Sequence, residues 1–591
     1  MYAFWKNQST GVEAATKRRG AMAVLAGLSL TVLFAMVAFA VDVGMIALTE
    51  ARLQKNADAA ALAAAQQLSG TLDPSTVRAN ACLAAQNVYI ANVGGNAAHA
   101  YFDPNQDVLF GQSAWNSQSQ TYTYNWGNQY TPYNVVQVFG RRIVRQPDPN
   151  YNYPLDQRLP LFFAPVLGQN SASIQTSAMA SFMPRDIMLV LDFSHSMCYD
   201  SQFYRLGLLS QSQIETSLLN IWQDLGSPVY GNLQFTPSTL TFKGPAASGS
   251  NPYITVAWQG TSVSVTSGQT ITKVRLKYSN NVAQTFSGSG KTGTFQGTGS
   301  SNGQEIVSCW VLSGGNANQS TGGYGLNFSF ANTNVISALG LTNVHYPYPA
   351  GSWSEFVDYC TGGSADVVNA GYQYQFGAML WVNYLQDIHG SYAETPDLWK
   401  TREMPTYILK QGVSSFINYL TSAQADDRVG LSIYSTGDSI GAILEQGLTT
   451  SISNVNTITQ QRQAGHYDPY TNIGMGMQVA RKEIEKNARP RAFRLMVVMT
   501  DGVVNRPTNA TVGTNLVLSE AAAAAADNIK ILTISMGVMA DVDLMQQAAN
   551  ATNGINFVVP GGSDYATYQQ QLLQTFETIA ASRPLQLISG Q

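Results

Sequence analysis

Residues 186–196 read DIMLVLDFSHS, and this stretch decides the fold of the chain around it. Its first part is a short, uninterrupted apolar run, which predicts a strand buried on both faces of a sheet. Similar runs recur at Val429–Tyr434, Leu495–Met499, Ile531–Ser535 and Ile555–Val559. Helical patterns lie between the runs, at Tyr407–Leu420, Asn472–Asn487, Asn515–Asp527, Asp541–Asn550 and Tyr565–Ala580. Strands that alternate with helices predict a Rossmann-like, doubly wound, mostly parallel α/β sheet.

Oxygen-bearing side chains follow the predicted strands at three places. The first strand runs into a DxSxS motif formed by Asp192, Ser194 and Ser196. Thr471 precedes a helix in the segment YTNIGMG, and Asp501 follows another buried strand in MTDG. Because open α/β sheets bind ligands at the carboxyl ends of their strands, we expect these five side chains to meet there. Carboxylates and hydroxyls suit a hard cation, so the sequence predicts a site for Mg²⁺, with Mn²⁺ or Ca²⁺ as alternatives.

Together these motifs resemble the metal-ion-dependent adhesion site (MIDAS) of the von Willebrand factor type A (vWA) family. The resemblance implies that Ser194 and Ser196 bind the ion directly. It implies that Asp192 and Asp501 act partly through water, and Thr471 directly or through water. A carboxylate of a protein or surface ligand would then fill the open metal position. The variable His195 is expected to face solvent, because the oxygen set already satisfies a hard ion.

About 200 residues separate the first predicted strand from the helix that should follow it. This length exceeds any ordinary loop, so Tyr199–Arg402 is predicted to be an inserted domain, and residues 184–198 and 403–591 form the vWA domain. Alternating patterns at Ile271–Tyr278 and Val307–Leu312 predict strands. With the aromatic, helix-like segment Ala370–Ile388, they predict a β-sandwich and a helical return.

The N-terminal region contains a candidate membrane anchor. Ala21–Val41 carries no charge and has about the ~20 residues that a transmembrane helix needs. Basic residues at 17–19 precede it, which places residues 1–20 in the cytoplasm and the chain after Asp42 outside. A cleaved signal peptide is the alternative, because Ala38-Phe39-Ala40 resembles a cleavage site. The length of the apolar run and its helical continuation favour a retained anchor, residues 21–41.

The helical pattern continues from Gly20 to Leu68. This segment, with its LQKNADAAALAAA stretch, closely resembles the N-terminus of TadG-like proteins of the tight-adherence (Tad, or Flp) pilus-assembly family. The resemblance implies a single-pass protein of the bacterial inner membrane, with its bulk periplasmic or extracellular and with other pilus or envelope subunits as partners. Leu25 stands where prepilins of that system carry Glu, which argues against cleavage after Gly20.

Residues 42–183 are predicted to form a pilin-like helix and a small α+β region. The segment LPLFFAPVLG, Leu159–Gly168, continues the TadG-like pattern. Short strands are expected at Ala100–Phe102, Val135–Phe139 and Ile174–Phe182.

The composition narrows the possible functions. Charged residues make up 12% of the chain and the net charge is −4, which gives no electrostatic footprint for nucleic acid. The segment SGKT at 289–292 resembles a phosphate-binding loop, but Thr285 stands where the first glycine should be. HExxH and CxxC motifs do not occur, so we expect no enzyme.

The chain has four cysteines, which allow three pairings. Cys198 and Cys360 lie near the two ends of the insertion, and a bridge between them is one of the three.

Two functions remain. The first is a Tad-like, pilus-associated or cell-envelope vWA protein that binds a partner or surface ligand through a Mg²⁺-dependent MIDAS. The alternative is a non-adhesive scaffold or assembly factor of the envelope pilus or secretion machine.

Overall fold

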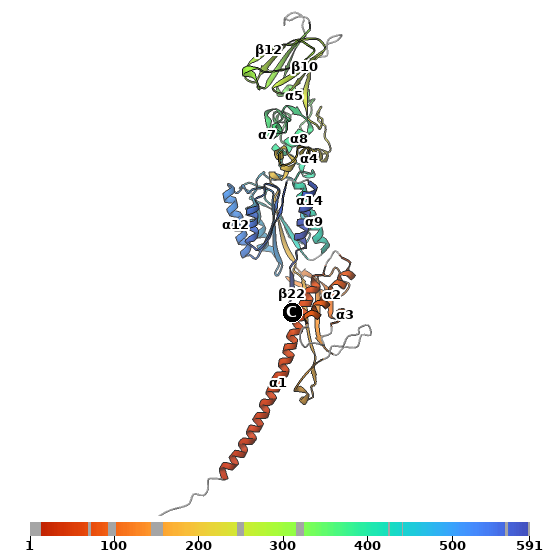
Figure 1. Cartoon of the computed structure of the whole chain (residues 1–591), viewed down its shortest axis with the longest axis vertical. Helices are drawn as coiled ribbons and strands as arrows, with labels where there is room; N and C mark the ends of the chain where they lie inside the picture. Colours follow the sequence, from red (N-terminus) through yellow and green to blue (C-terminus); the bar gives the residue numbers. More distant parts are fainter. Residues whose placement is uncertain are drawn as a thin grey trace, which may run out of the picture. The chain divides into compact units, whose positions relative to one another are not determined.

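The computed structural model describes residues 13–68, 72–92, 102–116, 118–143, 158–244, 253–314, 324–423, 426–439, 441–561 and 565–588. The chain forms two compact units (Figure 1). The first combines Met1–Pro184, Leu420–Asp426 and Ser582–Gln591, and the second combines Arg185–Tyr419 and Asp427–Ala581. Of the strand expected at Ala100–Phe102, only Phe102 lies within the described residues.

The first unit is organised around the long helix α1 (Glu13–Ala65). Its N-terminal half extends away from the other elements of this unit (Figure 1). The large apolar side chains from Met22 to Val41 are 43–70% exposed. The most apolar stretch within Met22–Ala65 has a mean hydropathy of 2.5 and none of it is buried. This helix is therefore long and apolar enough to cross a membrane, and it is not the core helix of a soluble domain, although a signal sequence would meet the same criteria.

The second half of α1 packs into a small α+β core. Ala57, Ala60, Ala61 and Ala64 recur at helical spacing and are fully buried. Their small side chains let the helix α2 (Pro74–Asn92) and an antiparallel sheet approach closely. The sheet has the order β2-β1-β3-β6-β22. Its strands are β1 (Val108–Asn116), β2 (Thr121–Trp126), β3 (Val135–Arg142), β6 (Ile174–Phe182) and β22 (Leu585–Ile588).

The last strand lies in a different sheet from the one that the sequence predicted. Residues up to 591 were expected in the vWA domain, but Leu585 of β22 pairs with Phe182 of β6. The Met183 amide also donates to the Pro584 carbonyl at 2.8 Å. The free edge of β6 explains this pairing, because an unpaired edge leaves a row of backbone donors and acceptors to satisfy.

The second unit contains a six-stranded sheet of order β18-β17-β7-β19-β20-β21. The five predicted strands are confirmed and run parallel: β7 (Arg185–Leu191), β17 (Arg428–Ile433), β19 (Phe493–Thr500), β20 (Lys530–Met536) and β21 (Asn556–Val559). All seven residues of β7 are buried, as the apolar run predicts. The edge strand β18 (Ile443–Thr449) is antiparallel and was not predicted, nor was α10 (Ser453–Gln460).

Helices cover both faces of this sheet, and the five predicted helices are confirmed. Core residues show that α11 (Ile473–Asn487), α12 (Ala510–Ala526) and α13 (Val542–Asn550) pack on one face. The helices α9 (Thr406–Ala423) and α14 (Tyr565–Ala581) lie on the other (Figure 1). There the rings of Phe416 and Phe576 meet at 6.0 Å between centroids.

Buried charges close the amino-terminal end of the sheet. The Arg185 guanidinium donates to the Asp427 carboxylate at 2.8 Å. Asp186 accepts from Arg428 at 2.9 and 2.8 Å, and from the amide and side chain of Arg489 at 2.6 and 3.0 Å. Asp186 is completely buried and Arg489 is 2% exposed, so the ions depend on one another for their solvation.

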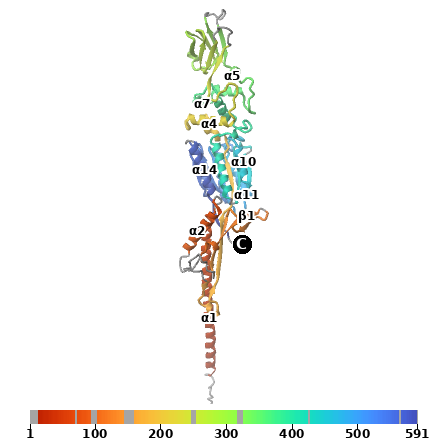
Figure 2. The ribbon, with the colours of Figure 1, turned by 90° about the vertical axis from the view of Figure 1, so that its right-hand side faces the viewer.

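The insertion contains the predicted β-sandwich. One sheet has the order β13-β10-β9-β8-β16 and the other β12-β11-β14-β15. The strands are β8 (Ser238–Lys243), β9 (Ile254–Trp258), β10 (Ser262–Ser267), β11 (Ile271–Tyr278), β12 (Ala283–Ser287), β13 (Thr292–Gln296), β14 (Ile306–Ser313), β15 (Tyr324–Ser329) and β16 (Gln375–Phe376). Val256, Val265, Val274 and Val311 share one core between the sheets. The strands coloured yellow to green form a body of their own in both views (Figures 1 and 2).

Short helices link the sandwich to the α/β sheet. They are α4 (Gln211–Asp224), α5 (Asn332–Ala338), α6 (Trp353–Asp358), α7 (Ala365–Asn369) and α8 (Ala378–Ile388). The helical return was expected, whereas α4 was not. The SGKT segment lies between β12 and β13 and precedes no helix, which removes its likeness to a phosphate-binding loop.

The two ends of the insertion lie side by side. The Asp200 amide donates to the Met404 carbonyl at 3.1 Å, and the Thr406 hydroxyl donates to the Met197 carbonyl at 2.6 Å. The chain therefore leaves and re-enters the α/β domain at nearly the same point.

The Cys198–Cys360 bridge that the sequence allows is not formed, because all four cysteines are free thiols. Cys198 lies in the 3₁₀ helix η2 (His195–Ser201), where its Sγ accepts from Gln202 at 2.9 Å and donates to the His195 carbonyl at 3.1 Å. Cys360 is buried in the core of the insertion. The thiol of Cys198 is thus engaged within its own turn and does not meet Cys360.

Candidate metal centre

Three adjacent parallel strands bring the predicted oxygens to one edge of the sheet. β7 pairs with β17 on one side and β19 on the other, so the loops after these strands converge. Asp192 follows β7 directly, and Ser194 has an extended backbone that starts η2. Asp501 follows β19 directly. Thr471 lies just before α11, in the segment whose Pro469 carbonyl accepts from the His195 amide at 3.3 Å.

Hydrogen bonds link four of the predicted residues in a chain. Asp192 accepts from the Ser194 amide and from the Thr500 hydroxyl, each at 2.8 Å. The hydroxyl oxygens of Ser194 and Ser196 are 3.0 Å apart. Ser196 in turn donates to Oδ1 of Asp501 at 2.6 Å. The structure therefore places the DxSxS motif and the MTDG aspartate in one constellation.

Thr471 lies opposite this chain and lines the same pocket as Ser196. Its amide donates to Oδ1 of Asn505 at 2.9 Å, and the Asn505 amide donates back to the Thr471 carbonyl at 3.1 Å. Asn505 was missed by sequence reasoning. The one sequence feature that could have identified Asn505 is its place four residues after Asp501, on the loop that leaves β19.

The two carboxylates form a buried pair. Asp192 is fully buried and Asp501 is 2% exposed. Burial raises the pKa of Asp192, and burial together with the charge of Asp192 raises the pKa of Asp501. Oδ2 of Asp501 is buried and makes no hydrogen bond with any described residue. Such an arrangement is costly without a counter-charge, and a cation would supply one.

The donor set fits a small, hard cation. Two carboxylates and three hydroxyls are oxygen ligands of the kind that Mg²⁺ takes. Within the described ranges no group of three or more His, Cys, Asp or Glu side chains is placed to hold a metal. Any ion at this site would therefore depend on hydroxyls as well as carboxylates, as the DxSxS spacing predicts.

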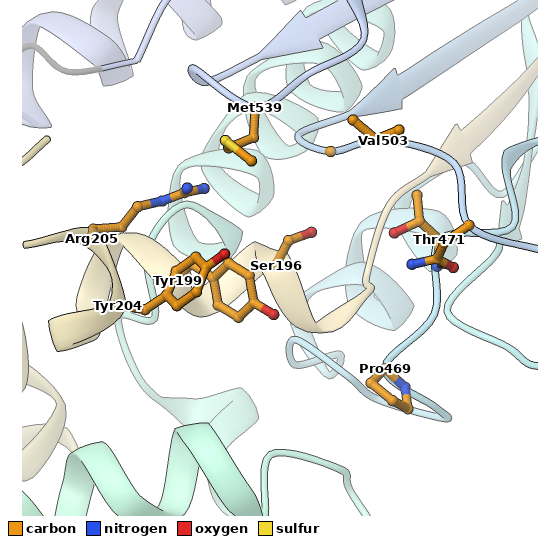
Figure 3. Close-up of a pocket in the computed structure, with 10 residues that line it drawn as sticks. Ser196, Tyr199, Tyr204, Arg205, Pro469, Thr471, Val503 and Met539 are labelled. Carbon is orange, nitrogen blue, oxygen red and sulfur yellow. Dashed lines mark hydrogen bonds between the residues drawn. The ribbon is translucent and has the colours of Figure 1, made fainter. Parts of the chain in front are cut away.

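An open pocket of about 160 Å³ lies beside the constellation. Figure 3 shows the Ser196 hydroxyl between Thr471 on one side and an aromatic and basic wall on the other. The lining residues are Ser196, Tyr199, Tyr204, Arg205, Pro469, Thr471, Gly502, Val503, Asn505 and Met539. The pocket thus presents two candidate metal-binding hydroxyls to a ligand that enters from outside.

The basic and aromatic wall comes from the first residues of the insertion. Arg205, at the end of the 3₁₀ helix η3 (Phe203–Arg205), is only 4% exposed. Its Nε donates to Asp200 at 2.9 Å, and its guanidinium lies 5.6 Å from the Tyr199 ring centroid and 5.7 Å from that of Tyr204. These residues were not predicted, because irregular 3₁₀ turns leave no periodic pattern to follow.

His195 packs against backbone and does not face solvent as expected. Its ring lies so close to Gly390 and Gly465 that a Cβ added at Gly390 would be 3.3 Å from its Cε1. The Tyr199 ring contacts it edge-on at 5.3 Å between centroids. Burial lowers the pKa of His195 to about 4. This side chain does not line the pocket and acts as a packing residue beneath the loop 192–196.

Two family models match separate parts of the chain. Residues 20–67 match the putative Flp pilus-assembly TadE/G-like family, and residues 402–571 match the von Willebrand factor type A domain. Both predicted resemblances are confirmed over these residues. The second match begins after the insertion and leaves out β7 and its DxSxS motif, but strand pairing places β7 between β17 and β19 in the same sheet. The insertion therefore splits one vWA domain.

No curated protein matches the chain. Among solved structures, an aerotolerance-related membrane protein from Bacteroides fragilis is 14% identical, with 30% of this chain and 90% of that one covered and a TM-score of 0.23. The pilus adhesin SpaC from Lactobacillus rhamnosus GG is 14% identical, with 30% and 28% covered and a TM-score of 0.24. Manganese-loaded TRAP protein from Plasmodium vivax is 16% identical, with 31% and 70% covered and a TM-score of 0.22.

Proposed function

We propose that this chain is a pilus-associated binding protein of the bacterial envelope that holds its ligand through a metal ion. Asp192, Ser194, Ser196, Thr471 and Asp501 would bind Mg²⁺, with Mn²⁺ or Ca²⁺ as alternatives. The observation that carries the proposal is the buried, unpaired Oδ2 of Asp501 next to an open pocket. The TadE/G-like match at residues 20–67 supports the link to a pilus system.

When bound, the ion would supply the positive charge that anchors a ligand carboxylate. The protein supplies the hydrogen bonds that position the two aspartates. Thr500 and the Ser194 amide hold both oxygens of Asp192, and Ser196 holds one oxygen of Asp501. The aromatic rings of Tyr199 and Tyr204 line one side of the pocket. The insertion would thus set ligand specificity while the vWA domain provides the common anchoring contact.

We propose binding and not catalysis. Among the described residues that line the pocket, none carries a carboxylate or an imidazole that could act as a general base there. Burial also raises the pKa of Tyr199, which keeps its phenol protonated.

The same geometry serves a scaffold that contacts only other envelope subunits, and exposure separates the two functions. An adhesin would be labelled on whole cells by a membrane-impermeant reagent and lost on shearing. A scaffold would be labelled only after the outer layers are opened.

We further propose that α1 anchors the protein in the inner membrane as a single span, with residues 1–20 in the cytoplasm and the bulk outside. The apolar helix and the TadE/G-like match support this arrangement. Lipid cross-linking from Leu28, described below, tests the anchor directly.

The binding proposal predicts that ligand capture depends on both the ion and a carboxylate. Full-length protein in nanodiscs is passed over arrays of short peptides that contain Asp or Glu, next to matched Asn or Gln peptides. We expect binding to acidic peptides in Mg²⁺, and loss of about 100-fold or more in affinity with chelator, because the ion makes the central contact. Equal binding in chelator, or equal binding of the amide peptides, would contradict the proposal.

The wall of the pocket provides a second prediction. Arg205→Gln is expected to weaken acidic-peptide binding by about ten-fold or more, since hydrogen bonds to charged groups contribute roughly 1.5–3 kcal/mol. Mg²⁺ affinity should not fall, because Arg205 donates to Asp200 and not to a predicted metal ligand, and loss of a positive charge does not weaken a cation site. The matched control is Arg506→Gln, which removes the same charge from a residue that does not line the pocket. Titration calorimetry measures both affinities, and equal effects of the two variants would exclude a ligand role for Arg205.

A further inference from the structure

A short apolar loop in the first unit has no cover among the described residues. The loop follows β4 (Leu159–Pro160), forms the 3₁₀ helix η1 (Ala164–Leu167) and leads into β5 (Ser171–Ala172). Four large side chains point outward from it: Phe162, Phe163, Val166 and Leu167 are 68%, 47%, 89% and 82% exposed. No charged residue occurs from Leu159 to Ala172. So dense an exposed apolar patch marks a contact surface.

The backbone of the loop adopts a defined, hydrogen-bonded turn. The Gly168 amide donates to the Pro165 carbonyl at 3.0 Å, and Gly168 adopts a φ of +86° that closes the turn. A residue with a side chain would be strained at that φ. The turn therefore presents its four apolar side chains in a defined arrangement.

Asp42 of α1 pins this loop to the helix. Its carboxylate accepts three backbone hydrogen bonds, from the amides of Phe162, Phe163 and Ala164 at 2.8, 3.0 and 2.7 Å. Asp42 as a whole is only 5% exposed, and its charge serves to hold the loop. Three amide donors at one carboxylate fix the loop at one level along α1.

A small cluster fixes the inner side of the loop. Leu159 and Ile174 are buried against Leu53 of α1, with Met45 and Ile46 packed at the edge. The inward side chains thus face the helix, while the outward ones stay largely exposed in the described part of this unit.

The position on α1 where Asp42 holds the loop coincides with the end of the apolar span of that helix. Ala21–Val41 is about 31 Å long as a helix, which matches the hydrocarbon thickness of a bilayer. Asp42 is the next residue. The exposed apolar surface of α1 therefore continues sideways onto the loop at the height where the membrane surface would lie.

We propose that the loop Leu161–Gly168 is a second membrane contact, which dips Phe162, Phe163, Val166 and Leu167 into the leaflet that α1 leaves. The bilayer is the occupant because the patch is continuous with the apolar span and lies at its end. Aromatic and aliphatic side chains of this kind insert at the headgroup and acyl boundary. The proposal rests on the proposed anchoring by α1. Two contacts would restrain the tilt of the helix, which a single span does not.

Lipid photo-cross-linking from single positions tests the contact. Full-length protein with p-benzoyl-phenylalanine in place of Val166 is reconstituted into vesicles of palmitoyl-oleoyl phosphatidylethanolamine and phosphatidylglycerol and irradiated. Leu28, within the span, is the positive position, and Leu83 on α2, which is 57% exposed, is the matched apolar control. We expect lipid adducts at Val166 within about two-fold of Leu28 and about ten-fold above Leu83, because only the first two reach acyl chains.

The outcomes separate the loop from the anchor. Adducts at Leu28 without adducts at Val166 overturn the loop contact and leave the anchor intact. Absence of adducts at both positions overturns the anchor, and the loop contact with it. Protein adducts in place of lipid adducts at Val166 assign the patch to another chain and overturn the proposal. Asp42→Ala supplies a second measurement. Once the three hydrogen bonds from backbone amides are removed, we expect lipid adducts at Val166 to fall about five-fold and lipid adducts at Leu28 to stay unchanged.

Discussion

Asp192→Ala is expected to reduce Mg²⁺ affinity by more than about 100-fold, which exceeds the 10–100-fold cost of losing a mere supporting partner of a metal ligand. Acidic-ligand binding should disappear with it. Asp192 stands at the centre of the constellation, held by Thr500 and the Ser194 amide. Its loss removes one of the two charges that would balance the ion. Titration calorimetry with Mg²⁺ on the full-length protein gives the affinity directly.

The same variant should not destabilise the ion-free protein. Asp192 is fully buried beside Asp501. Removing one of two buried carboxylates relieves repulsion, which offsets the loss of its hydrogen bonds with Thr500 and the Ser194 amide, so the melting temperature without Mg²⁺ should change little. In the wild type, Mg²⁺ at 100 times its Kd should add about 2.7 kcal/mol of stability, and this gain should vanish in the variant.

Asp438→Ala is the matched control for Asp192→Ala. It removes a carboxylate that is half exposed, does not line the pocket and accepts from the Thr508 amide at 3.0 Å. Mg²⁺ affinity should be unchanged there. If Asp192→Ala bound Mg²⁺ as tightly as Asp438→Ala, the metal site would be assigned to the wrong residues.

Asp186→Ala is expected to lower the free energy of unfolding of the second unit by about 3–5 kcal/mol, the cost of leaving buried charges without their partner. The carboxylate is fully buried and accepts from both Arg428 and Arg489. Its removal leaves the guanidinium groups of Arg428 and Arg489 without their carboxylate partner at the amino-terminal end of β7. The shift in urea midpoint, followed by tryptophan fluorescence, measures the loss.

A surface pair provides the comparison for Asp186. Asp397 contacts Lys400, and the two side chains are 42% and 50% exposed. Asp397→Ala should cost about 1 kcal/mol or less, because exposed ion pairs are screened and mobile. A midpoint for Asp186→Ala equal to that of Asp397→Ala would show that the buried network does not hold the sheet together.

The central strands could be predicted because burial on both faces leaves an unbroken apolar run. β7 and β19 are of this kind. β18 could not be predicted from the sequence, because an edge strand is only partly buried. Its residues ILEQGLT show neither an apolar run nor a clean alternation. β22 is four residues long, and its partner β6 lies about 400 residues away. No local pattern records a pairing at that distance.

The candidate site divides in the same way. Asp192, Ser194, Ser196 and Asp501 follow strands directly, so predicting the strands also places these oxygens. Arg205 reaches the pocket through consecutive 3₁₀ turns, whose path depends on contacts with distant residues such as Asn383, which accepts from the Phe203 amide at 3.0 Å. Such tertiary contacts cannot be deduced from spacing alone.

The paired ends of the insertion have an evolutionary consequence. Because Asp200 meets Met404 at the point of departure, the insertion leaves and re-enters the α/β domain at one place and adds nothing to the distance from β7 to α9. A module joined in this manner can be exchanged, lengthened or lost without rebuilding its host. The α/β domain keeps its candidate oxygen ligands, while the inserted module diversifies under selection by the molecules that it contacts. We therefore expect relatives that share the sheet and its candidate metal site to carry unrelated modules at this junction.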